Sequence, residues 1–514
     1  MRAWICNIAL LVGALLPHAA SAAQTFVVTR TDDPPPNGCQ TGDCSLREAV
    51  QSANSATGQG VDTVQLAAAT YSVGSTIEIT GDLLVTGVDA SQTHIVASVE
   101  LEPLLQIFEG APTYLLLRDL SLDALGGEEI DGDASATLVF EFVDALNPDG
   151  STYLSFGTGG LVNVYGSVIA GTFGCNGCKK ARLEESQFGT LQLLQTDPDV
   201  DYQILMIDVV VDGSGKITSG VRLSSPDTVW LIDVTVQNTS YGVRIESSPE
   251  TLIVDGLRYL DNREAFEVYA GADFTIARSE FRGNAPTTSG QPAALWIRNA
   301  GSHVVVEKST FANNIGTSDT GGAVLVEGGA ELSLRNTTFV NNSFSVAAAA
   351  DGARGAAIGY RSDPADTVLT LQNVTIVAPL AMPVGAQGSA LGGRGLGADV
   401  LLNIYNSVFA GSCRSDGVVP DFAIGNVKLS GDSCGFGSSN LTGVSRAALA
   451  LGPLGDHGGL TATVLPGPGS VVIDAGNNFG CLETDQRGVG RPSGLRCDAG
   501  AIETGDVIFA NGFN

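Results

Sequence analysis

The chain has 514 residues and a formal net charge of −29, because 55 Asp and Glu residues outnumber 26 Lys and Arg residues. Such an acidic surface repels phosphate backbones, so no nucleic-acid partner is expected, and high solubility, cation binding or a basic partner is favoured. The 65 glycines are nearly double the usual share and no long amphipathic helix is visible, which fits short strands joined by tight turns.

Residues 1–22 are typical of an export signal. Arg2 precedes an apolar run over residues 4–16, and Ala20-Ser21-Ala22 offers the small side chains of a cleavage site. The run is shorter than the roughly 20 residues that span a bilayer, and no later segment is long and apolar enough to do so. We therefore expect a secreted chain, extracellular or on the outer cell surface, with no transmembrane segment after signal cleavage.

Eight cysteines remain once Cys6 leaves with the signal, and an even number in an exported protein favours disulfides. Their positions suggest four local pairs: Cys39 with Cys44, Cys175 with Cys178, Cys413 with Cys434, and Cys481 with Cys497. Cys175 and Cys178 are also compatible with half a zinc site or a redox pair. No second Cys pair or His cluster lies nearby, so a structural disulfide is favoured and no metal site is assigned.

Residues 23–75 are expected to form an N-terminal cap and the first coil of a solenoid. Ser45 and Glu48 have the spacing of a capping box, which predicts a short helix from Leu46 to about Asn54. Its apolar side would cover the open end of the solenoid, where unpaired strand edges invite aggregation.

Residues 76–440 carry the repeat that decides the predicted fold. Short strands, each ending in an apolar residue, recur at intervals of 22 to 37 residues along the sequence. The clearest of these end residues are Phe188, Val211, Val236, Tyr259, Phe281, Phe311, Phe339, Ile376 and Phe409. A base period near 22 with insertions is typical of a solenoid, and alternating apolar and polar residues indicate strands. The sequence predicts an all-β fold: a single right-handed parallel β-helix of about 12 or more coils, with stacked inward side chains.

A polar residue precedes most of these strands. The row consists of Asp208, Asp233, Arg278, Lys308, Asn336, Asn373 and Asn406. Asn tolerates left-handed backbone angles, so the row predicts a ladder of sharp turns. Asp208, Asp233 and Asp255 leave a calcium site as the alternative, and no other cofactor is expected.

Three insertions, at residues 286–292, 343–355 and 378–398, interrupt the period. They fall at corresponding points of successive repeats. We therefore expect them to emerge on one face, which in repeat proteins is often the binding face.

The strand before the turn row alternates inward apolar residues with outward polar ones. The two outward rows are Arg222, Arg244, Glu267, Trp296, Leu325 and Ser224, Glu246, Tyr269, Arg298, Glu327. The candidate glycan-binding residues are Arg222, Arg244, Glu246, Glu267, Tyr269, Trp296, Arg298 and Glu327. Aromatic rings pack on sugar faces, Arg pairs with uronic carboxylates and Glu accepts from hydroxyls. The alternative is that opposite charges only stabilise a solvent-facing sheet.

Residues 441–503 are expected to form an irregular, disulfide-bonded C-terminal cap, followed by a tail at residues 504–514. The cap contains a dense charged cluster made of Asp474, Asp485, Arg487, Arg491, Asp498 and Glu503. Pairing of Arg with carboxylates inside the cap is the favoured interpretation, and a catalytic cluster is the alternative.

Both ends of the chain resemble known families. Cys44-Ser45-Leu46-Arg47-Glu48-Ala49 resembles the motif that names the CSLREA family of exported bacterial proteins. Residues 451–459, 473–476, 485–488 and 497–503 resemble the choice-of-anchor Q domain of β-helical surface proteins. Residues 506–514 resemble a Phe-x-x-Gly-Phe tail of some Gram-negative exported proteins, which implies a sorting tag. These families have no established common activity.

The middle of the chain resembles a parallel β-helix of the pectin-lyase type, whose active groove lies on an outward strand face. That resemblance implies that Arg222, Arg244 or Arg298 could act as a base, and that Glu246 with Glu267 could serve a hydrolase. No G-x-S-x-G, H-E-x-x-H or phosphate-cradling motif occurs. We therefore expect a non-enzymatic secreted or surface protein for adhesion or glycan and matrix contact. The alternatives are a polysaccharide lyase or glycoside hydrolase, and a passive structural surface protein.

Overall fold

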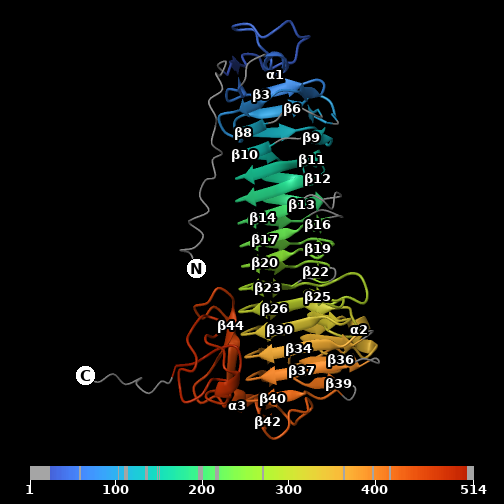
Figure 1. Cartoon of the computed structure of the whole chain (residues 1–514), viewed down its shortest axis with the longest axis vertical. Helices are drawn as coiled ribbons and strands as arrows, with labels where there is room; N and C mark the ends of the chain where they lie inside the picture. The colour runs from blue at the N-terminus through green and yellow to red at the C-terminus, as the bar shows by residue number, and fades with distance from the viewer. Residues whose placement is uncertain are drawn as a thin grey trace, which may run out of the picture.

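Figure 1 shows the computed structural model of the chain as a long stack of coils, with the C-terminal segment lying along one side of the stack. The structure describes residues 23–505, apart from 57–59, 102, 109–113, 134–136, 148, 150, 195–200, 215–218, 269–270, 272, 363–364, 396–398 and 416–417. The expected export signal and the expected sorting tag at residues 506–514 lie outside the described residues.

The coils build three parallel sheets, named I, II and III in the order in which the chain passes through them. Sheet I stacks β1 (Thr25–Val27), β2 (Asp62–Gln65), β5 (Leu83–Thr86), β8 (Tyr114–Asp123), β10 (Thr137–Ala145), β11 (Ser151–Tyr165), β12 (Val168–Glu184), β14 (Gln203–Ile207), β17 (Thr228–Ile232), β20 (Thr251–Asp255), β23 (Asp273–Ala277), β26 (His303–Glu307), β30 (Glu331–Arg335), β34 (Thr367–Gln372), β37 (Val400–Tyr405) and β40 (Phe422–Ile424).

Several long strands bend around a corner and continue into the next sheet. Sheet II stacks β3 (Thr70–Val73), β6 (His94–Ala97), the ends of β8 and β10, the starts of β12 and β13 (Gln187–Leu194), β15 (Val210–Asp212), β18 (Thr235–Gln237), β21 (Arg258–Leu260), β24 (Glu280–Arg282), β27 (Thr310–Ala312), β31 (Thr338–Val340), β35 (Thr375–Val377), β38 (Val408–Ala410), β41 (Val427–Leu429) and β42 (Leu441–Val444). Sheet III stacks β4 (Ile77–Ile79), β7 (Leu105–Ile107), β9 (Glu128–Asp133), parts of β11, β12 and β13, β16 (Val221–Ser224), β19 (Val243–Ile245), β22 (Phe266–Val268), β25 (Leu295–Ile297), β29 (Val324–Glu327), β33 (Ile358–Ser362), β36 (Leu391–Gly395) and β39 (Cys413–Ser415).

The predicted inward row is confirmed. The row from Phe188 to Phe409 occupies one continuous register across the stacked strands of sheet II. The rings of Phe281, Phe311 and Phe339 stack with centroids 4.6 and 4.7 Å apart, and all three are fully buried. Because the described strands stack in more than twelve coils, the predicted parallel β-helix is confirmed.

The predicted turn row is confirmed as well. Its seven members all have left-handed backbone angles, with φ between 45° and 56°. Asp255, which belonged to the calcium alternative, forms an ion pair with Arg278. Within the described ranges, no group of three or more His, Cys, Asp or Glu is placed to hold a metal ion.

The N-terminal helix α1 (Leu46–Ser55) begins at the predicted capping box. The Ser45 hydroxyl accepts from the N–H of Glu48, and the Glu48 carboxylate accepts from the N–H of Ser45 at 2.8 Å. Ala49, Val50 and Ala53 are buried where the helix contacts β1, β2 and β4. The four disulfides of the structure are the four local pairs that the sequence suggested, including Cys175 with Cys178.

A lysine occupies the position that follows Phe409 in the register of the inward row. Lys428 lies beside Phe409, is 1% exposed, and donates from Nζ to the carbonyls of Leu429 and Ser430 at 2.7 and 3.0 Å. Burial lowers the pKa of its ammonium group below the usual 10.5. The unfolded chain therefore binds this proton more tightly, and folding stability rises with pH from the lowered pKa up to about 10.5.

Replacing Lys428 with Met is expected to raise the free energy of unfolding at pH 7 by about 1 kcal/mol, because an apolar side chain avoids the buried charge. The rise in stability with pH should also shrink in this variant. Urea unfolding at pH 7 and pH 10 measures both effects, and K179M changes an exposed lysine as the control. Destabilisation of K428M at pH 7 would contradict the inference that the buried charge of Lys428 lowers the stability of the fold.

The C-terminal segment follows β42, the last strand of sheet II. It lies laterally on sheet II, where Figure 1 shows it beside the strands of the last coils. This segment contains α3 (Arg446–Leu449), β43 (Leu451–Gly455), β44 (Thr463–Pro466) and the short 3-10 helix η2 (Asn478–Gly480), and β43 pairs antiparallel with β44.

Side chains of sheet II and of the turn row hold this segment in place. The Gln486 side chain accepts from the Thr338 hydroxyl at 2.6 Å and donates to the Thr310 hydroxyl at 2.9 Å. Asn336 and Asn406 donate their side-chain amides to the carbonyls of Thr484 and Asn477 at 2.7 and 2.9 Å. Two of the Asn residues of the turn row therefore bind the C-terminal segment directly.

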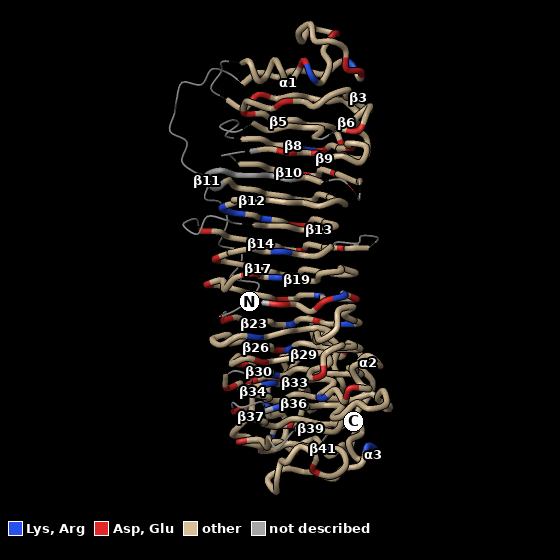
Figure 2. The backbone as a smooth tube through the Cα atoms, turned by 90° about the vertical axis from the view of Figure 1, so that its right-hand side faces the viewer, with Lys and Arg blue, Asp and Glu red and all other residues tan. Residues whose placement is uncertain are grey.

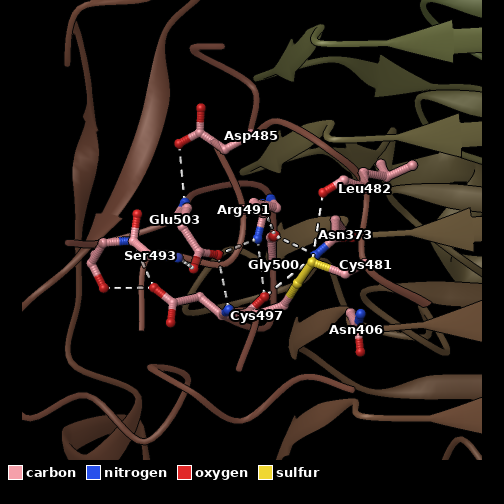
Figure 3. Close-up of polar contacts among 12 residues, drawn as sticks. Asn373, Asn406, Cys481, Leu482, Asp485, Arg491, Ser493, Cys497, Gly500 and Glu503 are labelled. Carbon is pink, nitrogen blue, oxygen red and sulfur yellow. Dashed lines mark hydrogen bonds and ion pairs between the residues drawn. A yellow bond between two sulfur atoms is a disulfide. The ribbon is translucent and has the colours of Figure 1, made fainter. Parts of the chain in front are cut away.

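The charged cluster of the C-terminal segment is an internal network (Figure 3). Arg491 pairs with Glu503 at 2.9 Å, and both side chains are fully buried. Arg487 pairs with Asp485 at 2.8 Å, and the Asp498 carboxylate accepts from the N–H of Asp474 at 2.7 Å. The pairing of arginines with carboxylates that the sequence favoured is therefore present.

Candidate functional site

The outward face of sheet III carries the first predicted row in the expected register. Arg222, Arg244, Glu267, Trp296 and Leu325 are Cα partners on the successive strands β16, β19, β22, β25 and β29. The row continues through Gly359 and Gly392 to Arg414. Residues far apart in the chain therefore share one continuous surface, which faces the viewer in Figure 2.

Charged side chains of this face pair across neighbouring coils. Arg222 contacts Glu246 at 2.7 Å through a two-point contact. Arg244 contacts Glu264 at 2.5 Å, and Glu267 forms an ion pair with Arg298. Such pairing holds the guanidinium groups in defined orientations, so the face presents ordered donors rather than mobile side chains.

Trp296 stands in the middle of this arrangement. Its indole N–H donates to the Glu327 carboxylate at 2.9 Å, and the guanidinium of Arg298 lies 4.4 Å from the ring centroid. Glu327 also accepts from Arg361 at 2.7 Å. The ring is partly exposed and is fixed by contacts at both its edge and its face.

Two predicted members of the outward rows are buried rather than solvent-facing. Leu325 is fully buried and Glu267 is 5% exposed. Glu267 is covered because it pairs with Arg298, and Leu325 is covered by the turn that contains Gly321. Tyr269 lies outside the described residues.

The insertions form a second layer over sheet III instead of projecting from it. Strands β28 (Ile315–Gly316) and β32 (Ser343–Phe344) pair in parallel above the coils, and α2 (Val346–Ala350) follows β32. A small apolar core joins Phe344 and Ala349 within this layer. Beneath this layer, the first outward row contains glycine. A Cβ on Gly359 would lie 2.2 Å from the N atom of Gly321, so a side chain does not fit there. The second layer therefore covers the first outward row at Leu325 and Gly359.

Sequence reasoning missed several charged residues of the site. Arg361 and Arg394 continue the second row, in register with Glu327, and Asp319 from the covering layer contacts Arg361 at 2.5 Å and Arg394 at 3.2 Å. The long insertions between repeats hid this register in the sequence. The repeated strand pattern around Arg361 and Arg394 was the signal that would have revealed it.

These residues complete an arginine strip that runs along the face of sheet III. The arginine strip consists of Arg222, Arg244, Arg298, Arg361, Arg394 and Arg414. Five carboxylates belong to the same surface, namely Glu246, Glu264, Glu267, Asp319 and Glu327. Since acidic residues outnumber basic ones by 55 to 26 in the chain, this face is distinctly less acidic than the molecule as a whole.

A pocket of about 430 Å³ opens at the uncovered end of the arginine strip. Arg222, Arg244 and Glu246 line it together with Tyr241, which is 44% exposed and lies 5.5 Å from the Arg244 guanidinium. The pocket combines two guanidinium groups, a carboxylate and an exposed aromatic ring. These groups can bind the carboxylates, hydroxyls and ring faces of sugars.

A comparison with protein-family models agrees with this fold. Residues 212–379 match a family model described as a right-handed β-helix region. No curated protein matches the chain. Among solved structures, the catalytic domain of a GH87 α-1,3-glucanase in complex with nigerose shows 12% identity and a TM-score of 0.39, covering 74% of this chain and 67% of that chain. A second structure of that domain with nigerose shows 13% identity and a TM-score of 0.33, covering 83% and 70%.

Proposed function

We propose that this chain is a secreted or surface-attached β-helix protein that binds an acidic polysaccharide on the outward face of sheet III, without cleaving the polymer. The observation that carries the proposal is the pocket at the end of the arginine strip, where Arg222, Arg244 and Tyr241 meet. A molecule with a charge of −29 repels a polyanion at long range, so binding depends on close contact with this strip.

Two features support export. The Cys44–Ala49 stretch resembles the CSLREA motif of exported bacterial proteins, and the C-terminal segment resembles the choice-of-anchor Q domain. The four disulfides are usual in extracellular proteins. In the part of the chain that the structure describes, no helix is long and apolar enough to cross a membrane.

Replacing Arg222 and Arg244 together with Ala is expected to weaken binding to an acidic polysaccharide roughly 100-fold, because each charge-assisted hydrogen bond contributes about 1.5–3 kcal/mol. Affinity electrophoresis of residues 23–514 in gels containing polygalacturonate measures the effect. Binding should also weaken as salt is raised from 50 to 500 mM.

Two controls make this result specific. R258A removes an exposed arginine from the outward face of sheet II and should leave retention unchanged. A neutral β-glucan in the gel should retain neither protein. Equal retention by both polymers would contradict the acidic ligand, whereas new reducing ends or unsaturated products would contradict binding without cleavage.

A further inference from the structure

A second pocket, of about 580 Å³, lies on the outward face of sheet II near the N-terminal end of the stack. The C-terminal segment contacts later coils of this sheet, from Thr310 onward. The pocket floor is a polar row in which Thr70, His94 and Ser121 are Cα partners on successive strands. This surface belongs to a different sheet from the arginine strip.

His94 and Ser121 are in direct contact on this floor. The His94 Nδ1 atom lies 2.6 Å from the Ser121 hydroxyl oxygen. The N–H of His94 donates to the carbonyl of Ala69, and the N–H of Ser121 donates to the carbonyl of Thr93. Because both backbones belong to the sheet ladder, the contact is set by strand register and not by two mobile side chains.

The walls of the pocket are apolar and open to solvent. Leu125 is 47% exposed and Leu146 is 59% exposed, and both line the pocket beside Ser121. Leu125 has a left-handed φ of 57°, and its N–H is held by the Asp123 carboxylate at 2.8 Å. Two leucines beside a polar floor suit a small molecule that has an apolar end and a polar reactive group.

We propose that Ser121 is the nucleophile and His94 the general base of an esterase site for esters of short carboxylic acids. A hydroxyl within hydrogen-bond reach of an imidazole is the arrangement that activates a serine. The leucines would contact the acyl chain. Asn147 also lines the pocket, and its Oδ1 accepts from the N–H of Asp149.

The reaction needs only water as a second reactant. The Ser121 oxygen attacks the ester carbonyl carbon while its proton moves to His94 Nδ1, and the carbonyl π electrons move onto the oxygen. The intermediate then expels the alkoxide, which leaves as the alcohol with the proton from His94. Water attacks the acyl-serine, gives one proton to His94, and releases the carboxylic acid as Ser121 regains that proton.

A second His–hydroxyl contact in the chain serves as an internal comparison. His457 Nδ1 lies 3.0 Å from the Thr463 hydroxyl, but Thr463 is fully buried on β44. Ser121 keeps 8% of its surface exposed and lines the pocket, whereas the fully buried Thr463 hydroxyl cannot receive an ester, so the His457 contact is structural. The variant H457Q therefore removes a similar contact without touching the proposed site.

The test uses residues 23–514 with p-nitrophenyl acetate, p-nitrophenyl butyrate and a fluorophosphonate probe. We expect hydrolysis of both esters and one covalent probe adduct, mapped by mass spectrometry to Ser121. S121A should abolish the adduct, H94Q should slow labelling at least about 100-fold, and H457Q should match the unmodified protein. Circular dichroism melting confirms that each variant is folded.

Two results would overturn the proposal. One is an adduct on another residue of the unmodified protein, a measurement that requires no variant. The other is ester hydrolysis by folded S121A at the rate of the unmodified protein. Neither result depends on whether the arginine strip binds a polysaccharide.

Discussion

Replacing Glu503 with alanine is expected to lower the free energy of unfolding by about 3–5 kcal/mol, because it leaves the buried Arg491 without its counter-charge. Both side chains are fully buried, with 2.9 Å between Arg491 Nη1 and Glu503 Oε2. Burial lowers the pKa of the Arg491 guanidinium and raises the pKa of the Glu503 carboxyl. Glu503 also accepts from the N–H groups of Ser493 and Asp498 at 2.7 and 2.9 Å. The variant therefore loses an ion pair and two backbone bonds at once (Figure 3).

Guanidinium unfolding, followed together with hydrogen exchange of residues 480–503, measures this loss. The variant E250A changes an exposed glutamate and should stay within about 0.5 kcal/mol of the unmodified protein. The double variant R491M/E503L replaces both charges with apolar side chains and should be more stable than E503A. A loss below about 1 kcal/mol in E503A would show that Arg491 is not sequestered from water.

Replacing Phe311 with alanine is expected to cost about 3–5 kcal/mol, because the removed ring leaves a cavity inside a stack that cannot collapse. Phe311 lies between Phe281 and Phe339, and its ring is nearly parallel to both, with interplanar angles of 4° and 7°. The three rings are held by strands in fixed register, so neighbouring side chains cannot move far into the gap.

The same unfolding experiment measures this cost, and hydrogen exchange locates it. Coils of a solenoid contact only their neighbours, so faster exchange should concentrate in β24, β27 and β31. F479A removes an aromatic ring that is 89% exposed and should be nearly neutral. Uniformly faster exchange over the whole stack would contradict local stabilisation by the ring stack.

The inward residues, the turns and the start of the first helix were predictable from the sequence. Alternation along a strand indicates which side chains face inward. The repeat period was therefore enough to predict the row through Phe281, Phe311 and Phe339. The left-handed turn at Asn373 and the capping box at Ser45 depend on residues within one or two turns of chain. Local spacing also indicated disulfides such as Cys39 with Cys44.

The candidate site was only partly predictable. The register of Arg222, Arg244 and Trp296 followed from the repeat, whereas Arg361 and Arg394 were separated from it by insertions. The sequence predicted which side chains point outward better than it predicted which of them solvent reaches. An outward side chain is solvent-facing only if nothing covers it, and alternation within a strand carries no information about covering segments.

By itself, the sequence determined the solenoid, its inward ladders and its turns, because these arise from local preferences repeated in every coil. The tertiary structure alone decided which outward surfaces remain open. Asn336 meets Thr484 across 148 residues of chain, and the turn at Gly321 buries Leu325 under the second layer. Such contacts join segments that do not belong to the same repeat. Which residues meet depends on the shape and the hydrogen-bonding groups of surfaces, and these surfaces exist only after the coils have stacked.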